Sequence, residues 1–258
     1  MASTLSAALR ATSVYFIRVA RSGKSTLLVS ALNPLFVIGA MGLGLGSLVD
    51  DESGLGGIDY LTFLAPGMMA AFAMQSAVGS SLWPVLGGIK WEGTYVAQTA
   101  TPLRPVDVLR GQLGYTGAEL GTNVVFTFLA MLVFGAVESP WGVLAVPAAV
   151  LTGLVYAAAV TGFSATQETD TAFPLIMRFG VIPSYLFSGT FFPVDQLPGA
   201  LEAVAKVTPL WHGVDLCRDL TLGDAGLAES AVHVAYLGVL LVVALAYAGR
   251  SFTRRLYA

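Results

Sequence analysis

Uncharged stretches, each long enough to cross a lipid bilayer, recur six times in this chain of 258 residues. A helix rises about 1.5 Å per residue, so about 20 apolar residues span a hydrocarbon core of roughly 30 Å. Only 11% of the residues are charged, against about 25% in soluble proteins. The sequence therefore predicts one all-α integral membrane domain over residues 1–258. Six transmembrane helices are expected at about 26–48, 61–86, 112–136, 143–164, 172–192 and 229–249.

Lys and Arg residues gather on one side of this predicted membrane. Ten of the 13 precede span one, join spans two and three, or follow span six: Arg10, Arg18, Arg21, Lys24, Lys90, Arg104, Arg110, Arg250, Arg254 and Arg255. The opposite loops VDDESGLGGIDY and VESPWG have none. The positive-inside rule then predicts a multi-pass protein with both termini in the cytoplasm. Ten Arg against three Lys, with abundant Ala, Gly and Val, indicate a bacterial source, so the membrane is expected to be the bacterial cytoplasmic one. The loop TQETD at 166–170 is also expected in the cytoplasm, although it is acidic.

The tetrapeptide GKST at 23–26 resembles the end of a phosphate-binding loop. A complete loop needs a glycine five residues before Gly23, where this chain has Arg18. The motif also leads into an uncharged run rather than a soluble helix, so we interpret it as the basic flank of span one. Upstream, apolar and basic residues of 5–24 fall on opposite helical faces. They favour an N-terminal interfacial helix over a disordered basic tail.

Two loops have a helical pattern. A short helix is expected from about Lys90 to Ala100, with Trp91 and Tyr95 exposed for docking into a partner's groove. A plain interfacial turn with an aromatic residue is equally compatible with this pattern. The segment after span five is too polar to span and too apolar for a free loop. It predicts two short re-entrant helices that cap a cavity on the outer face.

Ionisable groups inside the spans form no catalytic set, which argues against an intramembrane enzyme. Glu119 and Arg178 are expected near the cytoplasmic boundary, as an ion pair or as snorkelling side chains, with a gating role as the alternative. Cys217 is the only cysteine, and His212 and His233 are 21 residues apart without an H-E-x-x-H motif. No metal site is predicted. The composition also makes a nucleic-acid partner unlikely.

Three segments, FSGTFFPVDQLP, TPLWHGVDLCRDLTLG and WEGTYVAQTATPLRPVDVLRGQL, strongly resemble ABC-2 type exporter permeases. The resemblance covers nearly the whole chain and is strongest to the branch of nodulation-type lipo-oligosaccharide and antibiotic-resistance exporters. It implies a coupling helix around Trp91 to Ala97 and re-entrant outer helices from about 194 to 220. It also implies a dimer whose subunits each dock a separate ATP-binding subunit. ATP and Mg would then be bound by that partner, with no cofactor in this chain.

The sequence and this resemblance thus predict a non-catalytic permease subunit, expected as a homodimer, that exports an amphiphile such as a glycolipid, lipid-linked saccharide or hydrophobic drug. A stand-alone ion-coupled carrier or a non-transporting scaffold is the alternative. The residues expected to couple to the ATP-binding subunit are Lys90, Trp91, Glu92, Gly93, Thr94 and Tyr95. Candidate residues of the substrate path are Asn33, Phe36, Gln75, Asn123, Tyr156 and Phe187. Small residues at Gly42, Gly46 and Gly153 suit close helix contacts within or between subunits.

Overall fold

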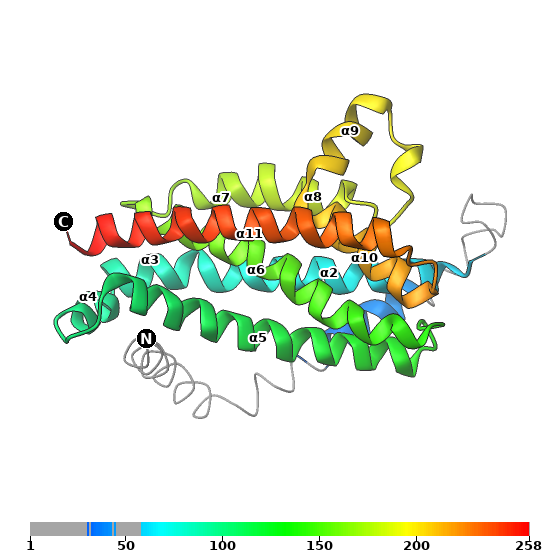
Figure 1. Cartoon of the computed structure of the whole chain (residues 1–258), viewed down its shortest axis with the longest axis horizontal. Helices are drawn as coiled ribbons and strands as arrows, with labels where there is room; N and C mark the ends of the chain where they lie inside the picture. Colours follow the sequence, from blue (N-terminus) through cyan, green and yellow to red (C-terminus); the bar gives the residue numbers. More distant parts are fainter. Residues whose placement is uncertain (1–29, 31, 43, 45–57, 258) are drawn as a thin grey trace.

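The computed structural model describes residue 30, residues 32–42, residue 44 and residues 58–257. Within these ranges the secondary structure is entirely helical, without a strand. The long helices run side by side along the longest axis of the molecule, and short helices lie at its two ends (Figure 1). The interfacial helix expected at 5–24 and the position of Gly46 fall outside the described residues.

Four helical segments are long and apolar enough to cross a membrane, and they coincide with predicted spans two, three, four and six. These segments are Tyr60–Lys90, Pro105–Val133, Pro140–Thr166 and Leu227–Leu256. They comprise α2 (Tyr60–Ser81) with α3 (Trp83–Lys90), α5 (Pro105–Val133), η1 (Pro140–Leu144) with α6 (Ala145–Thr166), and α11 (Leu227–Leu256).

Within the described residues, the helices at predicted spans one and five are shorter. Leu32–Gly42 and Phe173–Phe187 each have between 10 and 17 residues, fewer than the ~20 that cross a bilayer, and the residues that flank Leu32–Gly42 lie outside the described ranges. The second is interrupted: α7 (Phe173–Ile176) leads through the π-helical turn η2 (Met177–Val181) into α8 (Ile182–Phe187). Pro183 has no backbone N–H to continue the α-helical ladder, which favours such a bulge. Spans one and five stay predictions.

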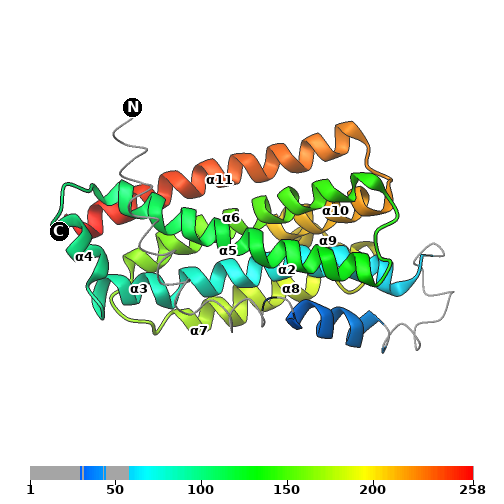
Figure 2. The ribbon, with the colours of Figure 1, turned by 90° about the horizontal axis from the view of Figure 1, so that it is seen from below.

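Helix α2 forms the centre of the bundle, and α11 lies at its edge. In the most apolar stretch of Tyr60–Lys90, 83% of the residues are buried. In the corresponding stretch of Leu227–Leu256, only 22% are buried. Figure 2 shows α11 along one margin, with α6 between it and α2. A helix that is apolar on every side is buried in the core, because each face needs an apolar neighbour. The exposed apolar side chains of α11 accordingly suit contact with lipid.

Two of the predicted small-residue contacts occur inside the chain. A Cβ atom on Gly42 would lie 2.1 Å from Leu61, and one on Gly153 would lie 3.0 Å from Leu120 and 3.1 Å from the carbonyl of Ala73. Both glycines therefore serve close packing between helices of one subunit. They give no information about the face used by a second copy.

The two short helices expected at 194–220 lie differently from each other. After the turn η3 (Val194–Gln196), α9 (Gly199–Val207) stands away from the bundle (Figure 1), and its stripe of Leu201, Val204 and Val207 is exposed. Within the described residues this stripe faces away from the bundle, so the expected cap over a cavity stays a prediction. By contrast, α10 (Pro209–Leu222) packs against α2 and α6. The re-entrant course through lipid stays a prediction.

The bundle has two chemically distinct ends. We call the end formed by α4 (Thr94–Thr99), α3 and the last turns of α11 the α4 end, and the opposite one the α10 end (Figure 1). The elements at the α4 end carry the cations that the sequence placed on one side: Lys90, Arg104, Arg110, Arg250, Arg254 and Arg255. The acidic loop at 166–170 lies there too, since Glu168 contacts both Lys90 and Arg255.

Candidate functional site

The connection between α3 and α4 makes a sharp turn at the α4 end. Helix α3 ends at Lys90, and Gly93 adopts φ = 63°, a left-handed conformation that suits glycine. The predicted helix from Lys90 to Ala100 is thus shorter, and only Thr94–Thr99 is helical. Trp91 is 63% exposed as expected, but Tyr95 is only 2% exposed, so the prediction that both rings are exposed was wrong for Tyr95.

Tyr95 is buried because its hydroxyl joins a polar chain inside the bundle. Pro84 has no N–H, so the carbonyl of Ser80 lacks its donor four residues later in the helix. The amide nitrogen of Gln112 on α5 donates to that carbonyl at 3.2 Å. The side-chain oxygen of Gln112 accepts a hydrogen bond from the Tyr95 hydroxyl at 2.9 Å. One glutamine therefore links α4 to the helix break on the central segment.

A groove of about 730 Å³ lies beside these hydrogen-bonded side chains, between α2, α3, α4 and α5. Its lining mixes apolar atoms with hydroxyl, amide and carboxylate groups, including those of Ser76, Ser80, Glu92, Gln112 and Glu119. Thr94 and Tyr95 line its wall at α4. The predicted coupling residues Glu92, Thr94 and Tyr95 are therefore part of the groove rather than only of an outer loop.

Ion pairs around Glu168 join three elements at the α4 end. The carboxylate contacts the ammonium of Lys90, at the end of α3, and the guanidinium of Arg255, near the end of α11. Hydrogen bonds from Arg255 and Lys90 lower the pKa of Glu168 to about 2. The negative charge of Glu168 in the TQETD loop is thus compensated by two cations, which explains why an acidic loop lies at the cationic end of the molecule.

Glu119 has a different partner from the one predicted. Its carboxylate accepts a hydrogen bond of 2.8 Å from the Ser80 hydroxyl, in the wall of the groove. Arg178 is exposed on η2, and among the described side chains no ion pair joins it to Glu119. Glu119 is therefore held in place by a neutral donor.

None of the six residues predicted for the substrate path lines the groove: Asn33, Phe36, Gln75, Asn123, Tyr156 and Phe187. Asn123 lies next to it and donates to the Ser76 hydroxyl at 2.9 Å. Gln75 hydrogen-bonds the side chain of Tyr185. Asn123 and Gln75 thus have hydrogen-bond partners within the subunit.

Sequence reasoning missed Ser80 and Gln112, the two residues that connect the groove to α4. One local signal pointed to Ser80: a proline inside a span leaves the carbonyl four residues earlier without a helical donor. Gln112 is polar and follows the start of a long apolar run, but nothing in the sequence pairs it with Ser80. That pairing depends on how α2 and α5 pack.

The sequence profile of the ABC-2 type transporter matches residues 9–222. The chain belongs to the ABC-2 type transporter family. Its membership indicates a transmembrane transport subunit rather than a catalytic one. It is a multi-pass membrane protein whose described part is a bundle of apolar helices.

Curated relatives within this ABC-2 family carry the name nodulation protein J. The one from Rhizobium leguminosarum bv. viciae is 29% identical over 240 residues, which cover 92% of this chain and 90% of that protein. The one from Rhizobium meliloti (strain 1021) is 28% identical over 221 residues, 85% of this chain and 82% of that protein. The one from Azorhizobium caulinodans is 24% identical over 232 residues, 88% and 85% respectively.

Proposed function

We propose that this chain is the permease subunit of an ATP-driven exporter, and that a separate ATP-binding subunit docks at its α4 end. The observation that carries the proposal is the exposed turn of Trp91 and Glu92 immediately before α4, whose Tyr95 is anchored through Gln112 to the break in the central segment. Exposed tryptophan beside a rigid anchor is the kind of residue that dominates binding energy at interfaces. ABC-2 permeases generally pair with ATP-binding subunits, which supports this assignment.

In this mechanism, ATP-driven movement of the partner displaces α4. The displacement reaches Ser80 through Tyr95 and Gln112, at the point where Pro84 already interrupts the helix. Widening of the groove between α2 and α5 would follow, because both of its walls meet at these residues. ATP and Mg stay with the partner, and this chain supplies the path.

The cargo we propose is an amphiphile of the glycolipid, lipid-linked saccharide or hydrophobic-drug class. The groove supports this choice because apolar lining atoms alternate with hydroxyl and amide groups, which suits a molecule with both kinds of surface. The name nodulation protein J among the relatives favours a lipo-oligosaccharide within this class. We further propose a homodimer with two copies of the partner, in the cytoplasmic membrane and with both termini in the cytoplasm.

The test is a reconstituted complex of this permease with an ABC ATP-binding subunit from the same genome. Replacing Trp91 by Ala, or Glu92 by Ala, is expected to weaken assembly of the two subunits and to reduce substrate-stimulated ATPase activity at least about tenfold, the loss of a strong interface residue. Trp141→Ala is the matched control, since Trp141 is similarly exposed but lies at the α10 end. Unchanged assembly and coupling in both Trp91 and Glu92 variants would refute the docking site.

The alternative is a stand-alone ion-coupled carrier, and the half-buried carboxylate of Glu119 in the groove is the observation that favours it. Transport by the isolated protein in vesicles with a proton gradient and no ATPase would support this reading. Loss of that transport in Glu119→Gln would then identify Glu119 as the group that carries the transported proton. The exporter proposal predicts no transport in such vesicles.

A further inference from the structure

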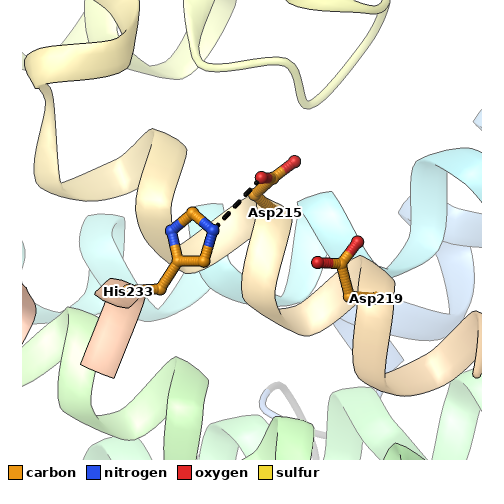
Figure 3. A group of neighbouring side chains, drawn as sticks. All are labelled: Asp215, Asp219 and His233. Atoms are coloured by element: carbon orange, nitrogen blue, oxygen red, sulfur yellow. Dashed lines mark ion pairs between the residues drawn. The ribbon is translucent and has the colours of Figure 1, made fainter. Parts of the chain in front are cut away.

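Two histidines and two aspartates meet where α10 packs against the start of α11 (Figure 3). No metal site was predicted from the sequence, because the histidines are 21 residues apart and no H-E-x-x-H motif is present. In the fold, Asp215 and Asp219 lie one turn apart on the same side of α10, and His233 projects toward them from α11 (Figure 3). One ligand atom from each of these three residues lies within 4.8 Å of the others.

One pair of these atoms already has the spacing of ligands on one small ion, and the third needs a small side-chain adjustment. The Nε2 atom of His233 is 3.4 Å from an Asp215 carboxylate oxygen. Two ligands bound at about 2.1 Å to a tetrahedral ion lie about 3.4 Å apart, whereas a direct N–H···O hydrogen bond is about 2.7–3.2 Å long. The distance from Nε2 to Asp215 thus resembles that between neighbouring ligands.

His212 fixes the orientation of His233 from the other side. Their Nδ1 atoms are 2.8 Å apart, so a single proton is shared between them. When His233 holds that proton, its Nε2 lone pair faces the two carboxylates. This is the usual arrangement at metal sites, where the ligating histidine donates its other N–H to a fixed acceptor.

Aromatic rings hold both imidazoles in place. Tyr236 stacks on His212 with ring centroids 3.9 Å apart, and Trp211 lies edge-on to His212 and His233 at 4.8 and 5.4 Å. The ring of His233 is therefore oriented before any ion arrives. Such pre-organisation lowers the cost of binding, because little side-chain freedom is lost.

The carboxylates are accessible, and their two negative charges meet nearby cations only at a distance, since Arg218 interacts electrostatically with both aspartates and Lys206 with Asp215. The Asp215 side chain is 34% exposed, while that of His233 is 8% exposed, so an ion can enter from the side of the aspartates. Arg218, on the same helix, donates instead to the carbonyls of Phe63 and Gly189. A cation between Asp215 and Asp219 would compensate their repulsion.

We propose that His233, Asp215 and Asp219 bind a divalent first-row transition-metal ion of the Zn²⁺ type, with His212 as a positioning residue. An imidazole beside two carboxylates suits such an ion better than Mg²⁺ or Ca²⁺, which prefer oxygen ligands alone. The ion would tie α10 to α11, the last spanning helix. This site does not depend on the identity of the cargo or of the energy source.

The test uses the full-length protein, purified in detergent without a histidine tag and stripped of metal with a chelator. Zn²⁺ is titrated by calorimetry, and Tm is measured with Zn²⁺ or with millimolar Mg²⁺. We expect about one Zn²⁺ per chain and a Tm several degrees higher with Zn²⁺, and no comparable change with Mg²⁺. Asp219→Asn and His233→Gln should each weaken Zn²⁺ binding at least about 100-fold, and His212→Gln about 10- to 100-fold.

Asp224→Asn is the matched control, because Asp224 is an exposed acid just beyond α10 and outside the cluster. It should bind Zn²⁺ like the unmodified protein. Zn²⁺ binding that is absent, or that is equally strong in Asp219→Asn and His233→Gln, would overturn the proposal. So would a Tm that rises on acidification alone and gains nothing from Zn²⁺, since a proton rather than a metal would then close the cluster.

Discussion

The two ends of the bundle are stabilised in different ways. Around the α10 end the described chain carries eight acids and two cations: Asp59, Glu138, Asp195, Glu202, Asp215, Asp219, Asp224 and Glu229, with Lys206 and Arg218. There α10 packs closely into the bundle against α2 and α6. The α4 end is cationic, and α4 itself has only six residues. It is linked to the bundle by one buried side chain, Tyr95, which packs in a small apolar cluster with Phe252, by a hydrogen-bonded chain through Gln112 and by exposed ion pairs around Glu168.

This difference indicates which end can move. Close packing of buried helices resists displacement, because interiors are packed like crystals and every gap costs contacts. A six-residue helix with one buried side chain, Tyr95, can shift while disturbing fewer packing contacts than α10 would. We therefore expect comparable substitutions to be more damaging at the α10 end, and the following predictions test that expectation in order of decreasing effect.

The largest loss of stability is expected for Gly213→Ala in α10. A Cβ atom there would lie 2.3 Å from the Thr152 hydroxyl oxygen and 2.7 Å from its methyl carbon, on the buried face of α6. Because a β-branched side chain in a helix has little rotamer freedom, the two helices must separate, at a cost of about 3 kcal/mol. Chemical denaturation in detergent measures this. Gly238→Ala, with no atom within 4 Å of the added Cβ, should be neutral or slightly stabilising.

A smaller loss, about 2 kcal/mol, is expected for Gln112→Leu. Leucine removes the hydrogen bond from Gln112 to the Ser80 carbonyl and the one from Tyr95 to Gln112, and a buried carbonyl left unsatisfied costs about 1–3 kcal/mol. The same variant should reduce substrate-stimulated ATPase activity in the assembled complex. Thr122→Val, at an exposed position of α5, is the control and should change neither property. If a stable Gln112→Leu protein kept normal substrate-stimulated ATPase activity, the hydrogen bonds through Gln112 would not transmit the displacement of α4.

Gly88→Ala sharpens the comparison directly, because it introduces a similar clash at the α4 end. The added Cβ would lie 2.8 Å from two atoms of the Tyr95 ring. Since Tyr95 belongs to a short helix at the surface, it can move aside, and the expected loss is about 1 kcal/mol, less than for Gly213→Ala. Gly79→Ala is the control, with nothing within 4 Å. A loss at Gly88 that equals or exceeds the loss at Gly213 would contradict our view of the two ends.

The smallest effect is expected from Glu168→Gln, and it should depend on pH. The pKa of Glu168 is lowered to about 2 by Arg255 and Lys90, so the ion pairs stabilise the folded protein above the usual carboxylate pKa of about 4.3. That contribution is lost as pH falls from about 4.3 toward 2. The difference in Tm between the protein and Glu168→Gln should accordingly shrink over this range and with added salt. Glu138 is an exposed acid at the α10 end, and the difference in Tm between the protein and Glu138→Gln should not shrink over this pH range.

The sequence by itself determined the class of protein and its long helices. Apolar length and charge are local properties, so four spans and the cationic end followed from composition along the chain. The family was also predicted from three short sequence segments, and the profile match over residues 9–222 confirmed it.

Only the tertiary structure decided which side chains meet. The burial of Tyr95, the hydrogen bond between Ser80 and Glu119, and the approach of His212 to His233 all join residues on different helices. Helical periodicity fixes which face a residue occupies, but not which neighbour that face contacts. The neighbour depends on the packing of whole helices against one another, which is a property of the bundle and not of any one segment.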